Sequence, residues 1–264
     1  MALQLLFGFL AALVIAWAAY RAHSLNRSGA WGAVLVGTVI FGLGGWKWAI
    51  LLLAFFITSS ALTRLFGARK AGLDEKFEKG GRRDIGQVLA NGWTACLFAG
   101  FHFFLPGAAW TWIGFAAALA AVNADTWSTE LGVLSPTLPR LITNGKPVEK
   151  GTSGAVSPLG TLSAVVGAAL IALLAGWLRP TGTFWPLVAG VTVAGAVGAL
   201  FDSLLGATVQ AIFWCPRCRK ETERHPRHTC GTETTQVRGW KWLNNDLVNL
   251  ACATLGALIG LVLP

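Results

Sequence analysis

Charged side chains are scarce in this sequence. Asp, Glu, Lys and Arg make up 12% of the 264 residues, whereas a soluble globular domain usually carries about 25%. Acidic residues are the rarer kind, with only 12 in the chain. Hydrophobic residues reach 54%, and several apolar runs approach the roughly 20 residues that a helix needs to cross a bilayer. The scarcity of charge therefore excludes an ordinary soluble domain and indicates an integral membrane protein.

The regular alternation of apolar and polar residues that marks a transmembrane β-barrel is also missing, because the apolar runs are continuous. The 32 glycines suit helices that pack closely within a membrane. We predict an all-α, polytopic membrane protein: a single transmembrane domain over residues 1–264 with about eight transmembrane helices. The predicted spans are 2–20, 29–44, 46–65, 86–105, 108–124, 157–178, 184–213 and 243–263.

Basic residues are distributed unevenly along a chain of net charge +9. If the N-terminus lies outside, the segments 21–28, 64–85, 125–156 and 214–242 face the cytoplasm, and they hold 19 of the 21 Lys and Arg residues. Because basic residues collect in cytoplasmic loops, the charge indicates topology rather than nucleic-acid binding. We therefore expect both termini outside and a cytoplasmic active site. The arginines follow the first apolar run instead of preceding it, which favours a retained helix over a signal peptide.

Polar residues lie near the inner ends of several predicted spans, where ionisable groups are functional candidates. The stretch NADTWSTELG, 123–132, follows the apolar run of the fifth span. Asn123 and Glu130 share one helical face, whereas Asp125 lies on another. The two carboxylates reach one site only if the helix bends or ends between them. A solvated helix end is the alternative interpretation.

A second set of polar residues opens the fourth span, in the stretch RRDIGQVLANG. Asp84, Gln87 and Asn91 share one helical face, and we expect these three residues, with Asn123, to help orient a substrate. Arg82 and Arg83 precede them and could bind a phosphate group through charge-assisted hydrogen bonds. The alternatives are that the arginines report topology alone and that the amides form hydrogen bonds between helices.

Two further sets belong to the seventh and eighth spans. Asp202 is flanked by apolar residues on both sides, and a buried carboxylate must be neutral, paired or bound to a metal. Asn245, Asp246 and Asn249 lie within one turn near the start of the last span. We expect Asp202 to be functional and the last three to help orient a substrate.

The loop between the fifth and sixth spans is rich in Gly, Ser and Thr. Successive backbone N–H groups in such loops can bind anions, and the following helix dipole favours them. The candidate phosphate ligands are Lys146, Lys150, Gly151, Thr152, Ser153, Gly154 and Ser157. With Asp125 and Asp202 as Mg²⁺ ligands and Glu130 nearby, these residues are typical of metal-assisted phosphoryl or nucleotidyl transfer.

Three of the five cysteines occur in the sequence CPRCRKETERHPRHTCG. Cys215, Cys218 and Cys230 with one histidine fit a tetrahedral zinc site, and the reducing cytoplasm favours metal over a disulfide. We prefer His228 to His225 as the fourth ligand. Four protein ligands leave no open position, so the segment 214–241 is predicted to be a cytoplasmic loop with a structural zinc knuckle.

Several motifs carry a resemblance over nearly the whole chain: SSALTRLFG, EKGGRRDIGQVLANG, NADTWSTELG, KGTSGAVSPLGTLSA, FDSLLGATVQ, CPRC…HTCG and RGWKWLNNDLVN. The chain resembles the integral membrane family of transmembrane protein 19 and the plant phytyl-phosphate kinase. The resemblance implies a kinase that converts a prenyl monophosphate to its diphosphate, with a nucleoside triphosphate such as CTP as donor.

A more distant similarity is to CTP-dependent polyprenol kinases and CDP-diacylglycerol synthases, which share an inner-end Asp followed by a glycine-rich loop with lysines. The KTxEG sequence of that group is replaced here by KPVEKGTSG. We therefore predict a membrane isoprenyl-phosphate kinase. The alternatives are a cytidylyltransferase that forms a CDP-lipid, which would use the same site, and a transporter of a phosphorylated solute, which usually shows inverted repeats.

Overall fold

The computed structural model describes residues 2–67, 76, 80–179 and 183–263. This part of the chain contains eight α-helices, and the second continues into a short π-helical segment, η1. The helices are α1 (Ala2–Arg21), α2 (Arg27–Val39) with η1 (Ile40–Gly44), α3 (Trp46–Phe66), α4 (Ile85–Phe104), α5 (Ala109–Gly132), α6 (Pro158–Leu178), α7 (Phe184–Thr208) and α8 (Asn245–Val262). The predicted class, an all-α polytopic membrane protein, is confirmed.

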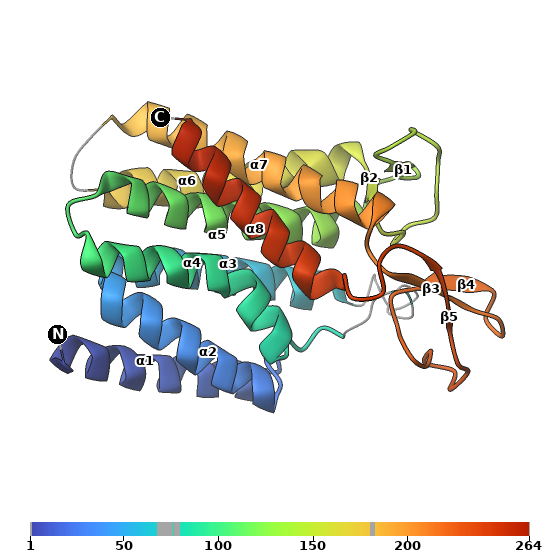
Figure 1. The fold of residues 1–264 in the computed structure, drawn as a ribbon, viewed down its shortest axis with the longest axis horizontal. Coiled ribbons are helices and arrows are strands. Elements are labelled where there is room, and N and C mark those ends of the chain that lie inside the picture. Colours follow the sequence, from blue (N-terminus) through green and yellow to red (C-terminus); the bar gives the residue numbers. More distant parts are fainter. Residues whose placement is uncertain (1, 68–75, 77–79, 180–182, 264) are drawn as a thin grey trace.

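Six of the described helices are long and apolar enough to cross a membrane: α1, α2 with η1, α3, α6, α7 and α8. Helices α4 and α5 are also long, but they carry polar residues such as Gln87 and Asp125 within their length. The start of α1 and the end of α8 lie at one end of the bundle, and both small β-sheets lie at the other (Figure 1).

Helix α5 is the centre of the bundle and packs against α3, α4, α6, α7 and α8. Small residues make this packing possible. A Cβ atom placed on Gly198 of α7 or on Gly256 of α8 would lie 2.7 Å or 2.6 Å from the Cβ of Ala121. Close approach through Gly and Ala is the usual way in which membrane helices associate, because lipid gives them no hydrophobic reason to do so.

Two helices end at residues that differ from the ends of the predicted spans. Helix α5 continues to Gly132 instead of ending at residue 124, and most residues of its polar last turns line a cavity. Helix α7 ends at Thr208, and the residues that follow it form a strand instead of extending the predicted span to 213.

The strands form two small antiparallel sheets. Strands β1 (Arg140–Leu141) and β2 (Ala155–Val156) pair within the loop between α5 and α6, with Arg140 opposite Val156. Strands β3 (Ile212–Cys215), β4 (Lys220–Thr222) and β5 (Thr235–Arg238) form a three-stranded sheet in the order β4-β3-β5. The predicted knuckle segment 214–241 therefore contains most of a three-stranded sheet that was not predicted.

Some residues used in the topology prediction cannot be placed. Arg69, Lys70 and Lys79, which belong to the second basic segment, lie outside the described residues. The same holds for residues 180–182, which belong to a predicted outer loop.

Candidate functional site

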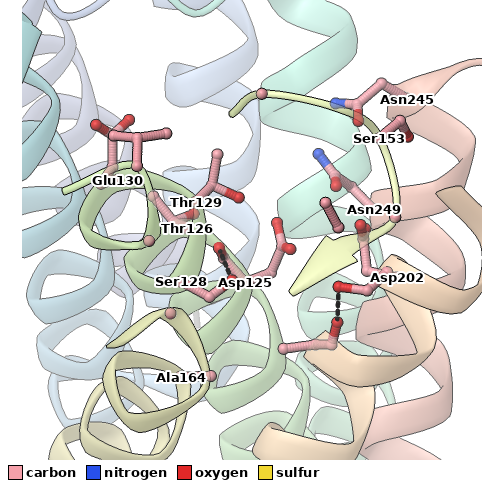
Figure 2. A pocket seen from close by; sticks show the side chains of 18 of the residues that line it. Asp125, Thr126, Ser128, Thr129, Glu130, Ser153, Ala164, Asp202, Asn245 and Asn249 are labelled. Atoms are coloured by element: carbon pink, nitrogen blue, oxygen red, sulfur yellow. Dashed lines mark hydrogen bonds between the residues drawn. The ribbon is translucent and has the colours of Figure 1, made fainter. Parts of the chain in front are cut away.

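A polar cavity of about 570 Å³ lies at the end of the bundle that carries the sheets. Its walls are the last turns of α3, α5 and α7, the first turns of α4, α6 and α8, and the glycine-rich loop 150–157. Figure 2 shows side chains of α5, α7, α8 and the glycine-rich loop around this space. The cavity thus joins parts of the chain that are as far apart in sequence as α3 and α8.

Asp125 on α5 and Asp202 on α7 both project into this cavity (Figure 2). They are close enough for their charges to interact. The Oδ2 atom of Asp202 is buried and has no hydrogen-bond partner among the described residues. A buried carboxylate oxygen without a donor is costly unless a cation or a proton meets it, so this pair fits the requirements of a hard divalent cation.

Glu130 lies on a different side of the same cavity (Figure 2). Helix α5 is continuous through both acidic residues, so the break that a shared site required does not occur. Instead the cavity extends around the end of the helix and reaches both side chains. Glu130 is only 7% exposed, and its Oε1 atom accepts a hydrogen bond of 2.9 Å from the hydroxyl of Thr63.

Arg83 lines the cavity on the side of Glu130. Its backbone is held by two hydrogen bonds of 3.0 Å, one to the carbonyl of Ser24 and one from the amide of Asn26. Burial lowers the pKa of Arg83 to about 10, and the nearby charge of Glu130 opposes this shift. At neutral pH the guanidinium therefore keeps its positive charge and faces the cavity from a fixed backbone.

Four predicted site residues do not line the cavity: Arg82, Asp84, Asn123 and Lys146. Arg82 and Lys146 are exposed. Asp84 caps α4 by accepting a hydrogen bond of 2.9 Å from the amide of Gln87. Asn123 is fully buried, donates a 2.7 Å hydrogen bond to the carbonyl of Gly167 and accepts one of 3.2 Å from Thr58. The structure gives these two side chains structural partners.

The glycine-rich loop is fixed from several directions. Lys150 donates hydrogen bonds of 2.9 Å and 2.7 Å to the carbonyls of Val133 and Ser135. Gly154 has a positive φ of 80°, and a Cβ atom there would lie 2.3 Å from the backbone nitrogen of Ala207. No residue other than glycine fits this conformation and this contact, so the loop lies directly against α7.

Ser157 ends the loop and caps α6, accepting a hydrogen bond of 3.1 Å from the amide of Gly160. The first turn of α6 therefore faces the cavity beside the residues Gly151, Thr152 and Ser153, which also line it. A helix N-terminus next to a glycine-rich loop is a favourable environment for phosphate groups.

The remaining predicted residues come from α4 and α8. Gln87 and Asn91 project from the first two turns of α4, and Asn245, Asp246 and Asn249 from the first turns of α8. The structure thus brings together amide and carboxylate side chains that lie more than 150 residues apart in sequence.

Several residues that line the cavity are not among the predicted site residues. Thr63 and Gln210 reach the cavity from α3 and from the residues after α7, and Glu223 reaches it from the end of β4. Gln210 donates a hydrogen bond of 2.9 Å to Glu223 and accepts one of the same length from Ser153. Its position in FDSLLGATVQ, two turns after Asp202, was the available indication. For Glu223 no sequence pattern pointed to the cavity.

Cys215, Cys218, His228 and Cys230 form a cluster that could hold a metal ion, since one ligand atom from each lies within 4.8 Å of the others. His228 is the histidine in the cluster, as predicted, while His225 stacks on Phe213 with ring centroids 4.5 Å apart. The Nε2 atom of His228 is buried without a described partner. Hydrogen bonds from Thr232 lower the pKa of the Cys230 thiol to about 5, whereas its hydrogen bond with Cys230 raises the pKa of the Cys218 thiol to about 11.

A family model described as "Integral membrane protein DUF92" matches residues 10–257. The chain belongs to this family. The match contains every residue that lines the polar cavity and all four residues of the cysteine–histidine cluster. The DUF92 assignment agrees with the resemblance predicted from the sequence motifs.

Relatives of this DUF92 protein occur in distant organisms. The chain is 33% identical to Protein PGR of Arabidopsis thaliana, with 97% of this chain and 94% of the relative covered. It is 34% identical to a membrane protein of Methanocaldococcus jannaschii, with coverages of 99% and 94%. It is 27% identical to Protein VTE6, chloroplastic, of Arabidopsis thaliana, with coverages of 90% and 65%. No solved structure matches the chain.

Proposed function

We propose that this DUF92 protein is a membrane kinase that phosphorylates a prenyl monophosphate, such as phytyl or geranylgeranyl phosphate. The phosphoryl donor is a nucleoside triphosphate, with CTP as the predicted one. One observation carries the proposal: two carboxylates, a glycine-rich loop at a helix N-terminus and an arginine line a single cavity. Phosphoryl transfer depends mainly on positioning and charge stabilisation, and this cavity offers both.

In this proposal Asp125 and Asp202 hold Mg²⁺, which usually takes one or two carboxylates together with phosphate oxygens. The chemistry supplied by Mg²⁺ at such a position is neutralisation of the charge on the triphosphate. Asp202 supports this role because its buried Oδ2 atom has no donor among the described residues. Glu130 assists from the other side, where its charge helps to keep Arg83 protonated.

The loop from Gly151 to Ser157 is assigned to the triphosphate. Its backbone N–H groups and the first turn of α6 favour anions, and Lys150 contributes a point charge beside them. Lys146 is exposed outside the cavity, so we assign the lysine contact to Lys150 alone.

The acceptor phosphate is assigned to Arg83, with Asn91 and Asn249 orienting it. An oxygen of this phosphate attacks the γ-phosphorus, the bond from that phosphorus to the β–γ bridging oxygen breaks, and the nucleoside diphosphate leaves. A phosphate monoester is already ionised at neutral pH, so no general base is needed.

Zinc is the ion proposed for the cluster Cys215, Cys218, His228 and Cys230. Four protein ligands complete a tetrahedral structural site. The cluster lies at the end of β3, and the neighbouring strand β4 leads to Glu223 at the cavity wall. The proposed zinc site therefore supports the cavity without taking part in the transfer.

The decisive experiment uses purified protein in lipid nanodiscs, geranylgeranyl monophosphate and CTP labelled on either the α- or the γ-phosphate. The kinase proposal expects only the γ-label in the lipid product. Transfer of the α-label would show a cytidylyltransferase, for which the same site would serve. No transfer of either label, with a panel of nucleotides, prenyl phosphates and phosphatidic acid, would rule out both enzymatic functions.

A further inference from the structure

A second cavity lies between α1, α2, α3 and α4, on the side of the bundle away from α6 and α7 (Figure 1). Its lining is almost entirely apolar. Among the lining residues only Arg83 and Asn91 are polar, and the others are Gly, Ala, Val, Leu, Ile and Phe. A cavity of this composition suits a hydrocarbon group and offers nothing to a charged solute.

The apolar cavity and the polar cavity meet at Arg83 and Asn91, which line both of them. The Arg83 side chain lies between the two environments. Its Cζ atom is 5.7 Å from the centroids of the rings of Phe55 and Phe56 on the apolar side, and Glu130 acts on its charge from the polar side. One molecule with an anionic head and an apolar tail would contact both cavities through this junction.

Arg83 has donors available for such a head group. A guanidinium carries five N–H groups, and among the described residues its side chain makes one hydrogen bond, of 3.3 Å, from Nη1 to the hydroxyl of Ser60. Its backbone is fixed by Ser24 and Asn26. The guanidinium is therefore both anchored and able to bind a phosphate in a bidentate manner.

The apolar cavity is elongated along the helices. On α1 it is lined from Gly8 to Ala19, a separation of about 16 Å at 1.5 Å per residue. On α3 it is lined from Ala49 to Phe56, a separation of about 10 Å, and Phe56 lies beside Arg83. Ala49 therefore marks the end of the apolar cavity farthest from the phosphate sites.

We propose that the apolar cavity binds the isoprenoid chain of the acceptor, with the acceptor phosphate on Arg83 and the chain end near Ala49. This inference rests on the proposed function and adds the site that selects the chain length. The isoprenoid chain gains little free energy when it moves from the lipid into the cavity, since lipid tails are as apolar as the cavity wall. The cavity therefore selects by shape and length, while the phosphate contacts supply most of the affinity.

The first test compares Ala49→Leu, which fills the far end of the cavity, with Ala61→Leu. Ala61 lies on the same helix, is exposed and lines neither cavity, so it is a matched control. Each variant is assayed with geranylgeranyl monophosphate and with dimethylallyl monophosphate. We expect Ala49→Leu to raise KM for the long acceptor about tenfold or more, to leave KM for the short one unchanged, and Ala61→Leu to change neither.

The outcomes separate this inference from the proposed function. If the wild-type protein is active and Ala49→Leu affects both acceptors equally, or neither, the chain site is wrong while the kinase stands. If the wild-type protein transfers no phosphoryl group to any acceptor, the kinase proposal fails and the chain site is tested by binding alone.

The binding test uses geranylgeranyl monophosphate with a diazirine at the chain end, crosslinked by light in nanodiscs and mapped by mass spectrometry. Labelling near Ala49, competed by unlabelled geranylgeranyl monophosphate, is the expected result. Labelling confined to lipid-exposed residues such as Trp31 and Leu35 would overturn the inference. Equal competition by phosphatidic acid would also overturn it, because the occupant would then be a phospholipid chain.

Discussion

Helices α1 and α5 have similar lengths and opposite surroundings. Of the 20 residues of α1, four small ones are buried, and large side chains such as Phe7 and Trp17 are exposed. Of the 24 residues of α5, fourteen are buried, among them Asn123 and Glu130. In a soluble protein the more apolar helix would be the inner one. Here the apolar helix faces the surface, and the helix that carries the carboxylates lies at the centre.

This difference between α1 and α5 follows from the lipid that surrounds a membrane protein. Hydrocarbon accepts an apolar helix at no cost but offers no partner to an amide or a carboxylate, so polar side chains need protein partners on every side. Helix α5 provides them through five neighbouring helices. The two cavities repeat the contrast: the polar one adjoins α5, and the apolar one adjoins α1.

The strongest test of the polar side is Asp202→Asn. The change keeps the shape of the side chain but removes the negative charge that we propose binds Mg²⁺. Removal of one electrostatic contribution of this kind typically lowers the rate by about 10²–10³-fold. We expect that loss in kcat with geranylgeranyl monophosphate and CTP, and a similar loss for Asp125→Asn.

Glu233→Gln serves as the control, because Glu233 is an exposed carboxylate with a loose 3.8 Å ion pair to Arg227. It makes the same acid-to-amide change away from both cavities. Full activity in Asp202→Asn and Asp125→Asn together would defeat the assignment of the metal ligands.

Glu223 reaches the polar cavity from the segment that carries the cysteine–histidine cluster. The substitution Cys218→Ser tests whether this segment needs a bound metal. Loss of a structural metal belongs to the most destabilising class of changes, about 4 kcal/mol or more. We expect loss of bound zinc by elemental analysis and a fall in Tm of roughly 10 °C. Cys96→Ala, a cysteine of α4 outside the cluster, should retain both zinc and Tm. Unchanged zinc content in Cys218→Ser would show that the cluster is not the zinc site.

The difference in burial between the two helices predicts a difference in stability. Leu119→Ala on α5 removes a side chain with 0% exposure and should lower the free energy of unfolding by about 3 kcal/mol through the cavity that it leaves. Leu6→Ala on α1 changes a side chain that is 52% exposed and should have a much smaller effect. Steric-trap or denaturant unfolding in detergent measures the free energy of unfolding of both variants. Equal losses of stability would contradict a buried α5 and an exposed α1.

Two glycines of the loop between α5 and α6 form a matched pair. Gly154→Ala introduces a Cβ at a φ of 80° and within 2.3 Å of Ala207, whereas Gly145→Ala introduces one at a φ of 68° into open space. Both substitutions carry backbone strain of about 1 kcal/mol, but only the first also displaces the loop from α7. We expect a rise of about tenfold in KM for the nucleotide in Gly154→Ala alone. Equal KM values in the two variants would separate the loop from nucleotide binding.

An effect of the same size is expected at the junction of the two cavities. Arg83→Lys keeps the charge but loses the planar, bidentate donor set, and should raise KM for the acceptor phosphate about tenfold, the equivalent of one charge-assisted hydrogen bond. Arg82→Lys, at an exposed neighbour outside the cavity, should change KM less. The reverse order would assign the acceptor phosphate to Arg82 instead.

Much of the architecture could be read from the sequence because the bilayer imposes simple rules. The continuous apolar runs predicted the helices, and the spacing of three cysteines and a histidine predicted the cluster that the structure assembles. The prediction was wrong where protein replaced lipid as the surroundings. Helix α5 does not end at residue 124, and its last turns form a wall of the polar cavity, with Glu130 buried by protein.

The composition and order of the side chains by themselves determined the membrane class, the helices and the polar stretches near their ends, because these depend only on local hydropathy and spacing. The tertiary structure alone decided which polar residues meet. It directed Asn123 and Asp84 to structural hydrogen bonds, and brought Asp125, Asp202 and Glu223 to one cavity. Helix packing fixes the direction of each side chain, and no local pattern in the sequence encodes the contacts between distant helices.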